Sequence, residues 1–268
     1  MSLLADLTAG AVEDADTRRE RVSQVEIVRA ALAQAPALDA VAALRQDARV
    51  KIIAEVKRAS PSRGDLATIP DPAHQASLYE QGGASAISVL TEQRRFKGSL
   101  DDLVAVKQRV TLPVLRKDFV ATPYQVLEAR AAGADLVLLI VAALDQPTLS
   151  ELFALTVELG MTPLVEAHSA DEVSRAADLG APIIGVNARD LSTFELDRDL
   201  FGRLAAGIPD GTIRIAESAV LAPSVVEHYR RAGADVVLIG EALVTNEPVA
   251  TLGQFLAAGD FPAGGTPA

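Results

Sequence analysis

Eight short apolar runs, repeated along the chain from residue 51 onward, constrain the fold of this sequence more than any other feature. Each run is rich in Val, Ile and Leu and is bounded by Gly, Pro or polar residues. Runs without polar alternation are typical of parallel strands that are covered on both faces of a sheet. The predicted strands are residues 51–56, 86–90, 113–115, 135–140, 163–165, 182–186, 212–216 and 235–239.

Longer amphipathic stretches alternate with these runs and are predicted to be helices, among them residues 71–81, 123–132, 147–159 and 170–179. Several end in Gly-Ala or Gly-Gly, and a glycine just past a helix readily adopts the left-handed backbone that turns the chain into the next strand. Eight such units in 268 residues favour the α/β class and a closed (β/α)8 barrel, the TIM barrel. An open doubly wound sheet is the competing architecture.

Residues 1–50 precede the repeat and are predicted to form an extra N-terminal helical segment before the barrel of residues 51–258, within one domain spanning 1–268. Helical periodicity over residues 17–33 places four apolar side chains on one face: Val22, Val25, Val28 and Leu32. Such a helix either packs without a chemical role, caps the barrel or covers its active site. The tail, residues 259–268, is rich in Gly, Pro and Ala and is predicted to be disordered.

Composition and charge narrow the classes of partner. The net charge is -11, so the chain gains little from counterion release, and nucleic acid is not an expected partner. The longest apolar run, near residues 136–144, is far shorter than the ~20 residues that span a bilayer. The N-terminus lacks the pattern of a signal peptide, so we expect a cytoplasmic protein without membrane contact. The absence of cysteine excludes disulfides and thiol catalysis.

Polar residues follow most of the predicted strands, where a (β/α)8 barrel carries its catalytic groups. Side chains alternate along a strand, so Glu55 and Lys57 point the same way. A single pair of this kind is compatible with a structural salt bridge. Polar groups from five strands converge around one mouth, where the ionisable ones shift one another's pKa and supply acids and bases. The candidate catalytic residues are Glu55, Lys57, Lys117, Glu166, Asn187 and Glu217.

Five segments carry a specific resemblance to a known family. In order and in spacing they resemble the signature segments of indole-3-glycerol phosphate synthases, and the resemblance extends from about residue 20 to residue 256. The segments are EVKRASPS at 55–62, SVLTEQRRFKGSLDDL at 88–103, PVLRKDF at 113–119, LVEAH at 164–168 and NARDL at 187–191.

The resemblance implies roles for the matching residues. Lys117 matches a general acid that protonates the substrate carbonyl during ring closure. Glu166 matches the acid–base group of the later steps, and Lys57 matches a lysine that binds substrate and assists dehydration. Three polar positions, expected to orient these groups and the substrate, are matched by Glu55, Asn187 and Glu217.

Further positions match substrate-binding residues of the family. Phe96 and Phe119 are expected to form apolar walls for an aromatic ring, with ordinary core packing as the alternative. Ser60 and Arg189 match polar binding positions. The phosphate site is expected at the ends of strands seven and eight, which carry Ser218, Ala219, Gly240 and Glu241.

Two positions depart from the commonest family pattern. Strand seven usually ends in Glu-Ser-Gly and here ends in Glu217-Ser218-Ala219, while Ala242 stands where the family often has serine. A methyl group at residue 219 would crowd a phosphate, or the site would demand a φ angle that alanine disfavours. The departures therefore bear on phosphate affinity more than on catalysis.

The resemblance implies a phosphorylated small-molecule substrate, 1-(2-carboxyphenylamino)-1-deoxyribulose 5-phosphate. Its ring closure needs an acid and a base but no electron sink, so no cofactor is expected. The three histidines are not spaced as a metal site, and His168 lies two residues after Glu166. No second barrel pattern is present, so no fused second enzyme is expected. The sequence leaves a monomer and a dimer both open.

Two other functions remain as alternatives. One is another phosphate-binding barrel, such as a sugar-phosphate isomerase or an aldolase that forms a Schiff base on Lys57 or Lys117. The other is a diverged barrel that binds a phosphorylated ligand without catalysis, a reading that Ala219 and Ala242 support. The presence of both Lys117 and Glu166 argues against it, because a binding protein needs neither an acid nor a base.

Overall fold

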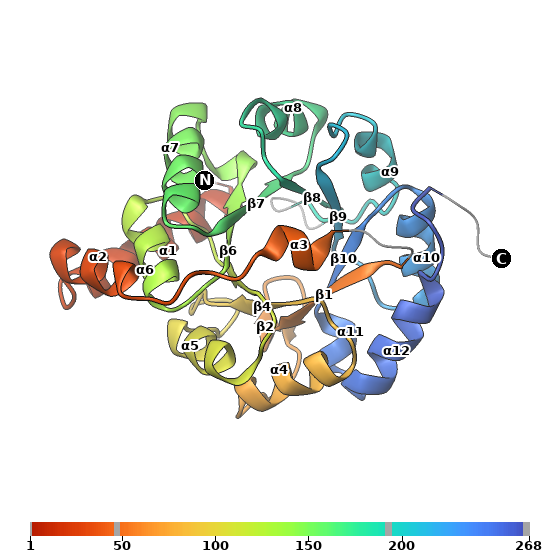
Figure 1. Ribbon diagram of the computed structural model, residues 1–268, viewed down its shortest axis with the longest axis horizontal. Coiled ribbons are helices and arrows are strands. Elements are labelled where there is room, and N and C mark those ends of the chain that lie inside the picture. Colours follow the sequence, from red (N-terminus) through yellow and green to blue (C-terminus); the bar gives the residue numbers. More distant parts are fainter. Residues whose placement is uncertain (1, 46–48, 191–194, 265–268) are drawn as a thin grey trace.

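The computed structural model describes residues 2–45, 49–190 and 195–264, and within them eight parallel strands close into a barrel (Figure 1). Around the barrel the order is β1-β10-β9-β8-β7-β6-β5-β4. The strands are β1 (Lys51–Val56), β4 (Ala86–Leu90), β5 (Val114–Lys117), β6 (Leu136–Ile140), β7 (Thr162–Ala167), β8 (Ile183–Asn187), β9 (Ile213–Glu217) and β10 (Val236–Ile239). The closed order confirms the predicted (β/α)8 barrel over an open sheet.

The observed strands overlap all eight predicted runs, and four of them extend further at their C-terminal ends. Strands β5, β8 and β9 end on Lys117, Asn187 and Glu217, and β7 continues through Glu166 to Ala167. The apolar runs stopped short because the final residues of these strands are polar and face the barrel mouth. A short hairpin of β2 (Ala59–Ser60) and β3 (Gly64–Asp65) follows β1.

Helices surround the barrel and connect its strands. They are α4 (Pro72–Gln81), α5 (Leu100–Arg109), α6 (Pro123–Ala131), α7 (Gln146–Glu158), α8 (Ala170–Asp178), α9 (Leu200–Ala205), α10 (Pro223–Arg231), α11 (Glu241–Val244) and α12 (Pro248–Ala258), with a 3-10 turn at Val141–Ala143. Many begin with a polar cap followed by proline, as at Asp71 and Thr122. Gly133 and Gly233 adopt φ angles of 87° and 100° after α6 and α10, as their place past a helix predicts.

The prediction of one helix over residues 17–33 is wrong. The segment divides between α1 (Leu3–Arg19) and α2 (Gln24–Leu32), because Ser23 and Glu26 form a capping box that begins a new helix. The predicted apolar face is wrong for Val22, Val25 and Leu32, which are exposed, whereas Val28 packs at the edge of a buried cluster. Val25 and Leu32 are 68% and 71% exposed, and α2 packs instead through Ile27 and Ala31.

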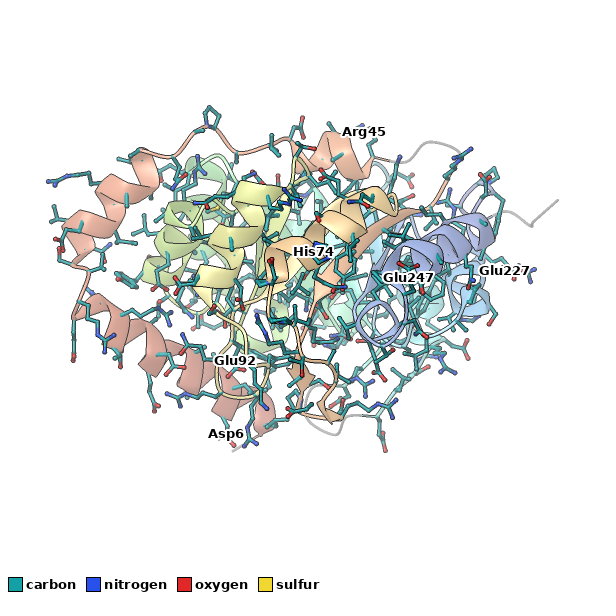
Figure 2. All side chains as sticks on the ribbon, turned by 90° about the horizontal axis from the view of Figure 1, so that it is seen from below. Asp6, Arg45, His74, Glu92, Glu227 and Glu247 are labelled. Carbon is teal, nitrogen blue, oxygen red and sulfur yellow. The ribbon has the colours of Figure 1, made fainter. Side chains whose placement is uncertain are left out.

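The N-terminal helices lie at opposite ends of the barrel. Leu7 of α1 lines a cavity at the C-terminal ends of the strands. By contrast, α3 (Ala40–Leu44) comes just before β1 and buries Leu44 completely against the lower barrel. Figure 2 shows the same separation, with Asp6 of α1 near Glu92 on one side and Arg45, next to α3, on the other. The extension therefore covers the mouth with one helix and closes the base with another.

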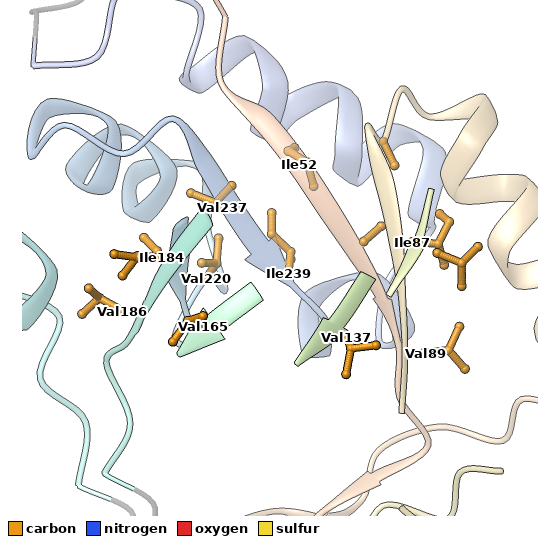
Figure 3. Close-up of a cluster of buried hydrophobic side chains, with 14 of the residues drawn as sticks. Ile52, Ile87, Val89, Val137, Val165, Ile184, Val186, Val220, Val237 and Ile239 are labelled. Carbon is orange, nitrogen blue, oxygen red and sulfur yellow. The ribbon is translucent and has the colours of Figure 1, made fainter. Parts of the chain in front are cut away.

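Side-chain alternation divides the core into two layers. Ile52 and Ala54 point outward into the layer between the strands and the helices, which Figure 3 shows with Ile52, Val137, Val165 and Ile184. Ile53 points into the barrel, where apolar residues from most of the strands fill the lower interior. Glu55 and Lys57 share the inward side with Ile53 and line the cavity above it.

The described part of the tail, residues 259–264, contacts α10, and the disorder of residues 259–268 stays a prediction. The ring of Phe261 is only 6% exposed, and its carbonyl accepts a hydrogen bond of 2.7 Å from Nε of the fully buried Arg230. The amide of Gly264 donates to the carbonyl of Arg230. Tertiary contacts to α10 thus hold residues 259–264, and residues 265–268 lie outside the described part. None of the helices in the described ranges has the length and apolar character needed to cross a bilayer.

Candidate active site

A cavity of about 330 Å³ opens at the C-terminal ends of the barrel strands. All of the sequence-predicted site residues line it, although they come from strands and loops distributed over most of the chain. They are Glu55, Lys57, Ser60, Phe96, Lys117, Phe119, Glu166, Asn187, Arg189, Glu217, Ser218, Ala219, Gly240 and Glu241. Phe96 and Phe119 therefore face the cavity as walls, rather than serving only as core.

The end of β1 carries an ion pair held by a close approach of backbone. Nζ of Lys57 lies 2.7 Å from Oε1 of Glu55. A Cβ atom at Gly240 would lie 2.5 Å from Oε1 of Glu55 and 2.9 Å from Nζ of Lys57. A larger residue at 240 would therefore displace the ends of both side chains from this arrangement.

Lys117 stands at the centre of the cavity's charged floor. Its Nζ lies 3.1 Å from Oε2 of Glu166 and 3.5 Å from Oε2 of Glu217, and its side chain is 13% exposed. Burial alone would lower the pKa of Lys117, but the surrounding carboxylates, above all Glu166, outweigh it and raise the pKa. The group is therefore an ammonium ion at neutral pH and can donate a proton into the cavity.

Glu166 and Glu217 form a pair of buried carboxyls with opposite tendencies. Their side chains are 1% and 2% exposed. Burial raises the pKa of Glu217, and the charge of Glu166 adds to that effect. Burial also acts on Glu166, but Lys117, His168 and a hydrogen bond from Asn187 lower its pKa overall. At neutral pH the pair thus holds a proton on Glu217 and a charge on Glu166.

Two details support this division between the carboxyls. Nδ2 of Asn187 donates to Oε1 of Glu166 at 3.3 Å, which favours the ionised form. Oε1 of Glu217 is buried and has no hydrogen-bond partner among the described residues. An ionised carboxylate oxygen left without a donor is costly, so this oxygen favours the neutral acid. Gly185 leaves the necessary space, since a Cβ there would lie 2.2 Å from Oε1 of Glu217.

The end of β9 turns through two unusual backbone conformations. Ser218 and Ala219 have φ angles of 71° and 63°, in the left-handed region that favours glycine. Oγ of Ser218 donates to Oδ1 of Asn187 at 2.7 Å, and the amide of Arg189 donates to the same oxygen at 3.0 Å. Asn187 thus connects the ends of β8 and β9, and residue 219 is alanine where the backbone favours glycine.

An apolar wall faces the charged floor. The rings of Phe96 and Phe119 lie 6.2 Å apart, between centroids, at an interplanar angle of 45°. The carboxylate of Glu92 accepts the backbone N–H groups of Arg94, Arg95 and Phe96 at 2.8–2.9 Å and so fixes the loop that carries Phe96. The wall is suited to a planar aromatic group.

Sequence reasoning missed several lining residues, of which Arg63 is the most informative. Its guanidinium lies 2.6 Å from Oε1 of Glu241 and so joins the β2–β3 hairpin to α11 beside the mouth. Arg63 directly follows the segment EVKRASPS, so a cation next to a substrate-binding segment could have been identified from the sequence. No periodic pattern marks Leu7, whose helix begins well before the periodic segment of residues 17–33. Within the described residues, no group of three or more His, Asp or Glu side chains has the arrangement of a metal site.

Comparison with known structures supports the architecture alone. The N-acetylmannosamine-6-phosphate 2-epimerase of Clostridium perfringens aligns with a TM-score of 0.62 at 14% identity, covering 81% of this chain and 96% of its own. The 3-hexulose-6-phosphate synthase of Salmonella typhimurium aligns with a TM-score of 0.63 at 16% identity, covering 78% and 98%. At such low identity these likenesses show the barrel fold.

Sequence comparison is far more specific. The family model for indole-3-glycerol phosphate synthase matches residues 4–254. An indole-3-glycerol phosphate synthase of Leifsonia xyli subsp. xyli is 70% identical over 257 residues, covering 95% of this chain and 98% of that protein. Indole-3-glycerol phosphate synthase 1 of Streptomyces coelicolor is 54% identical, covering 98% of each chain. The chain belongs to the indole-3-glycerol phosphate synthase family and is a carboxy-lyase of tryptophan biosynthesis.

Proposed function

We propose that this cavity closes the indole ring of 1-(2-carboxyphenylamino)-1-deoxyribulose 5-phosphate, with loss of carbon dioxide and water. The observation that carries the proposal is the position of the Lys117 ammonium between Glu166 and Glu217 on the cavity floor. An acid and an ionised base a few ångströms apart suit a reaction that needs a proton delivered and another removed. One chain, acting as a single barrel domain, supplies all of these groups.

In the first step the ring carbon that bears the carboxylate attacks the ketone carbon. The C–C bond forms as the carbonyl oxygen gains negative charge, and Lys117 gives that oxygen a proton. A cation is well placed for this task because it stabilises the developing alkoxide before the proton moves. Loss of carbon dioxide then returns the bonding electrons to the ring.

The second half of the reaction removes water. The hydroxyl made in the first step leaves with a proton, which Lys57 supplies beside Glu55. Glu166 takes the proton that must leave for the five-membered ring to become aromatic. Its low pKa keeps it ionised at neutral pH, and the hydrogen bond from Asn187 orients it. Glu217, as the neutral partner, does not compete for that proton.

Substrate orientation follows from the two sides of the cavity. The anthranilate ring packs against Phe96 and Phe119, and the phosphate lies near Ser218, Ala219, Gly240 and Glu241. Backbone amides at strand ends are suited to hold a phosphate in barrels of this kind. Ser60 and Arg189 bind polar parts of the substrate. Arg63 adds a cation near Glu241, where an anion would otherwise meet a carboxylate.

The test is an indole-fluorescence assay with purified protein and the carboxyphenylamino-deoxyribulose phosphate. The chain has no Trp, so the background emission is low and product appears as a rising signal. Borohydride added during turnover distinguishes the aldolase alternative, since an acid lysine leaves no covalent adduct whereas an imine is trapped. Absence of indole emission, or a trapped adduct on Lys57 or Lys117, would contradict the proposal.

A further inference from the structure

His168 follows β7 directly and lies between two carboxylates. Nε2 lies 3.5 Å from Oε1 of Glu166, and Nδ1 lies 3.4 Å from Oε2 of Glu172. The imidazole is only 12% exposed and does not line the cavity, so it cannot touch a substrate there. His168 and the side-chain amide of Asn187 both contact Oε1 of Glu166. Lys117 contacts the other oxygen, Oε2.

The start of α8 holds the imidazole in this position. Oε2 of Glu172 accepts the backbone N–H of His168 at 2.8 Å, and Oε1 accepts the hydroxyl of Ser169 at 3.2 Å. Ser169 in turn caps α8 by accepting the amide of Glu172. Glu172 is thereby fixed at both oxygens, and the short turn between β7 and α8 leaves the ring little freedom.

The charged groups around His168 favour its cationic form. Glu166 faces it from β7, Glu172 from α8 and Glu217 from β9, with the Lys117 ammonium of β5 behind Glu166. Burial lowers the pKa of His168, but the hydrogen bond to Glu172 and the negative charges of Glu166 and Glu172 raise it overall. Nε2 is buried and has no hydrogen-bond partner among the described residues, and its ion-pair contact is with Oε1 of Glu166.

We propose that His168 is a positioning residue whose positive charge decides which of the two buried carboxyls keeps their shared proton. An imidazolium in ion-pair contact with Glu166 stabilises the charge there more than it would on Glu217, and so leaves the proton on Glu217. Without this cation the two carboxyls become more nearly equal, and Glu166 is protonated for part of the time. Glu172 acts one step further out by holding His168 charged.

This inference rests on the proposed role of Glu166 as the base, and it predicts an effect that depends on pH. At pH values where the pair holds one proton, His168→Gln should lower kcat by about tenfold. This is less than the ~10²–10⁴-fold that a general base contributes, because Glu166 is still ionised for part of the time. At alkaline pH both carboxyls ionise and His168 loses its own proton, so the variant should approach the wild-type rate. KM should stay within about twofold throughout, because the substrate does not touch residue 168.

Two further variants provide a graded comparison and a control. Glu172→Gln leaves the cavity intact but removes the outer carboxylate, so it should give a smaller loss of kcat with the same dependence on pH. His74→Gln changes an exposed histidine of α4 (labelled in Figure 2) and should leave the profile unchanged. A loss of kcat that is equal at every pH, or a profile of His168→Gln that matches the wild type, would overturn the proposal.

A measurement independent of turnover separates this inference from the proposed function. In protein labelled with 13C at the glutamate carboxyls, the Glu166 signal, assigned through Glu166→Gln, reports its ionisation directly. The midpoint for Glu166 should move to higher pH in His168→Gln, and that for Glu217 should move to lower pH. Unmoved midpoints would overturn the inference even if indole is formed, whereas moved midpoints without indole formation would contradict only the proposed function.

Discussion

Leu164 and Glu166 lie two residues apart on β7, point to the same inner side of the barrel and are both almost fully buried, at 0% and 1% exposure. Burying a leucine contributes about 1.5–3 kcal/mol to stability. Burying a carboxylate opposes folding unless donors and cations compensate it, as Lys117 and Asn187 do here. Equal burial in the lower and upper barrel thus has opposite energetic meaning, and the upper layer is explained by chemistry rather than by stability.

The lower layer gives the largest expected effect. Leu164→Ala should reduce the free energy of unfolding by about 2–5 kcal/mol, because it leaves a cavity in a fully buried apolar interior. The kcat of the protein that remains folded should change by less than about twofold, since the charged groups stay in place. Urea denaturation together with activity in the native baseline measures both quantities. A large loss of kcat with unchanged stability would remove the distinction between the layers.

The upper layer should show itself in the dependence of stability on pH. The raised pKa of Glu217 means that the folded state holds this proton more tightly than the unfolded state. Its contribution to stability is complete below the ordinary glutamate pKa of about 4.3 and is lost as the pH rises through the raised pKa. Each unit by which the folded-state pKa is raised corresponds to about 1.4 kcal/mol. The lowered pKa of Glu166 acts in a separate, more acidic window, below that ordinary value.

Glu217→Gln provides the comparison, because the amide keeps the shape and cannot ionise. The melting temperature of the wild type should fall relative to that of the variant as the buffer is taken from acidic to slightly alkaline pH. Parallel curves for the two proteins over that range would show that Glu217 is not held as the neutral acid.

The N-terminal extension offers the same comparison between mouth and base. Deleting residues 1–22 removes α1 and with it Leu7, a wall of the cavity. A lost apolar contact of about 1.4 kcal/mol corresponds to a tenfold change, so KM should rise by about that factor while the barrel keeps its cooperative melt. Leu44→Ala, at the base, should lower stability without altering KM. A truncated protein that no longer melts cooperatively would show that α1 is structural.

Ala219→Gly should produce the smallest effect. The left-handed backbone costs an alanine about 1–2 kcal/mol, and glycine relieves this strain. Glycine also loses more conformational entropy on folding, which costs about 0.5–1 kcal/mol, so a small net gain in stability is expected. KM should fall more than kcat changes, because the methyl group acts on phosphate binding that is common to the ground and transition states. An unchanged or higher KM would show that the methyl group is harmless to binding.

Features that a short stretch of sequence encodes by itself were predictable. Apolar runs located all eight barrel strands but not the β2–β3 hairpin, and alternation correctly placed Glu55 and Lys57 on one side. The break before α2 was also local, in the Ser23–Glu26 capping box, but the stronger apolar periodicity concealed it. The burial of Phe261 and the Arg63–Glu241 ion pair join segments that are distant in sequence, and no local pattern encodes them. The strained backbone at Ala219 was anticipated only as one of two alternatives.

The central claim is that Lys117 is the acid of a charged catalytic layer, and its most direct test is the single-turnover rate of indole formation by Lys117→Ala. A positioned general acid contributes ~10²–10⁴-fold, so the rate should fall at least about a hundredfold with substrate still bound. Lys117→Arg should also fail, because the larger, planar guanidinium has a different shape from the compact ammonium. The rate is normalised to the folded fraction, since removing a cation from between Glu166 and Glu217 disturbs their charge balance. Near-native turnover by the folded Lys117→Ala protein would contradict the account.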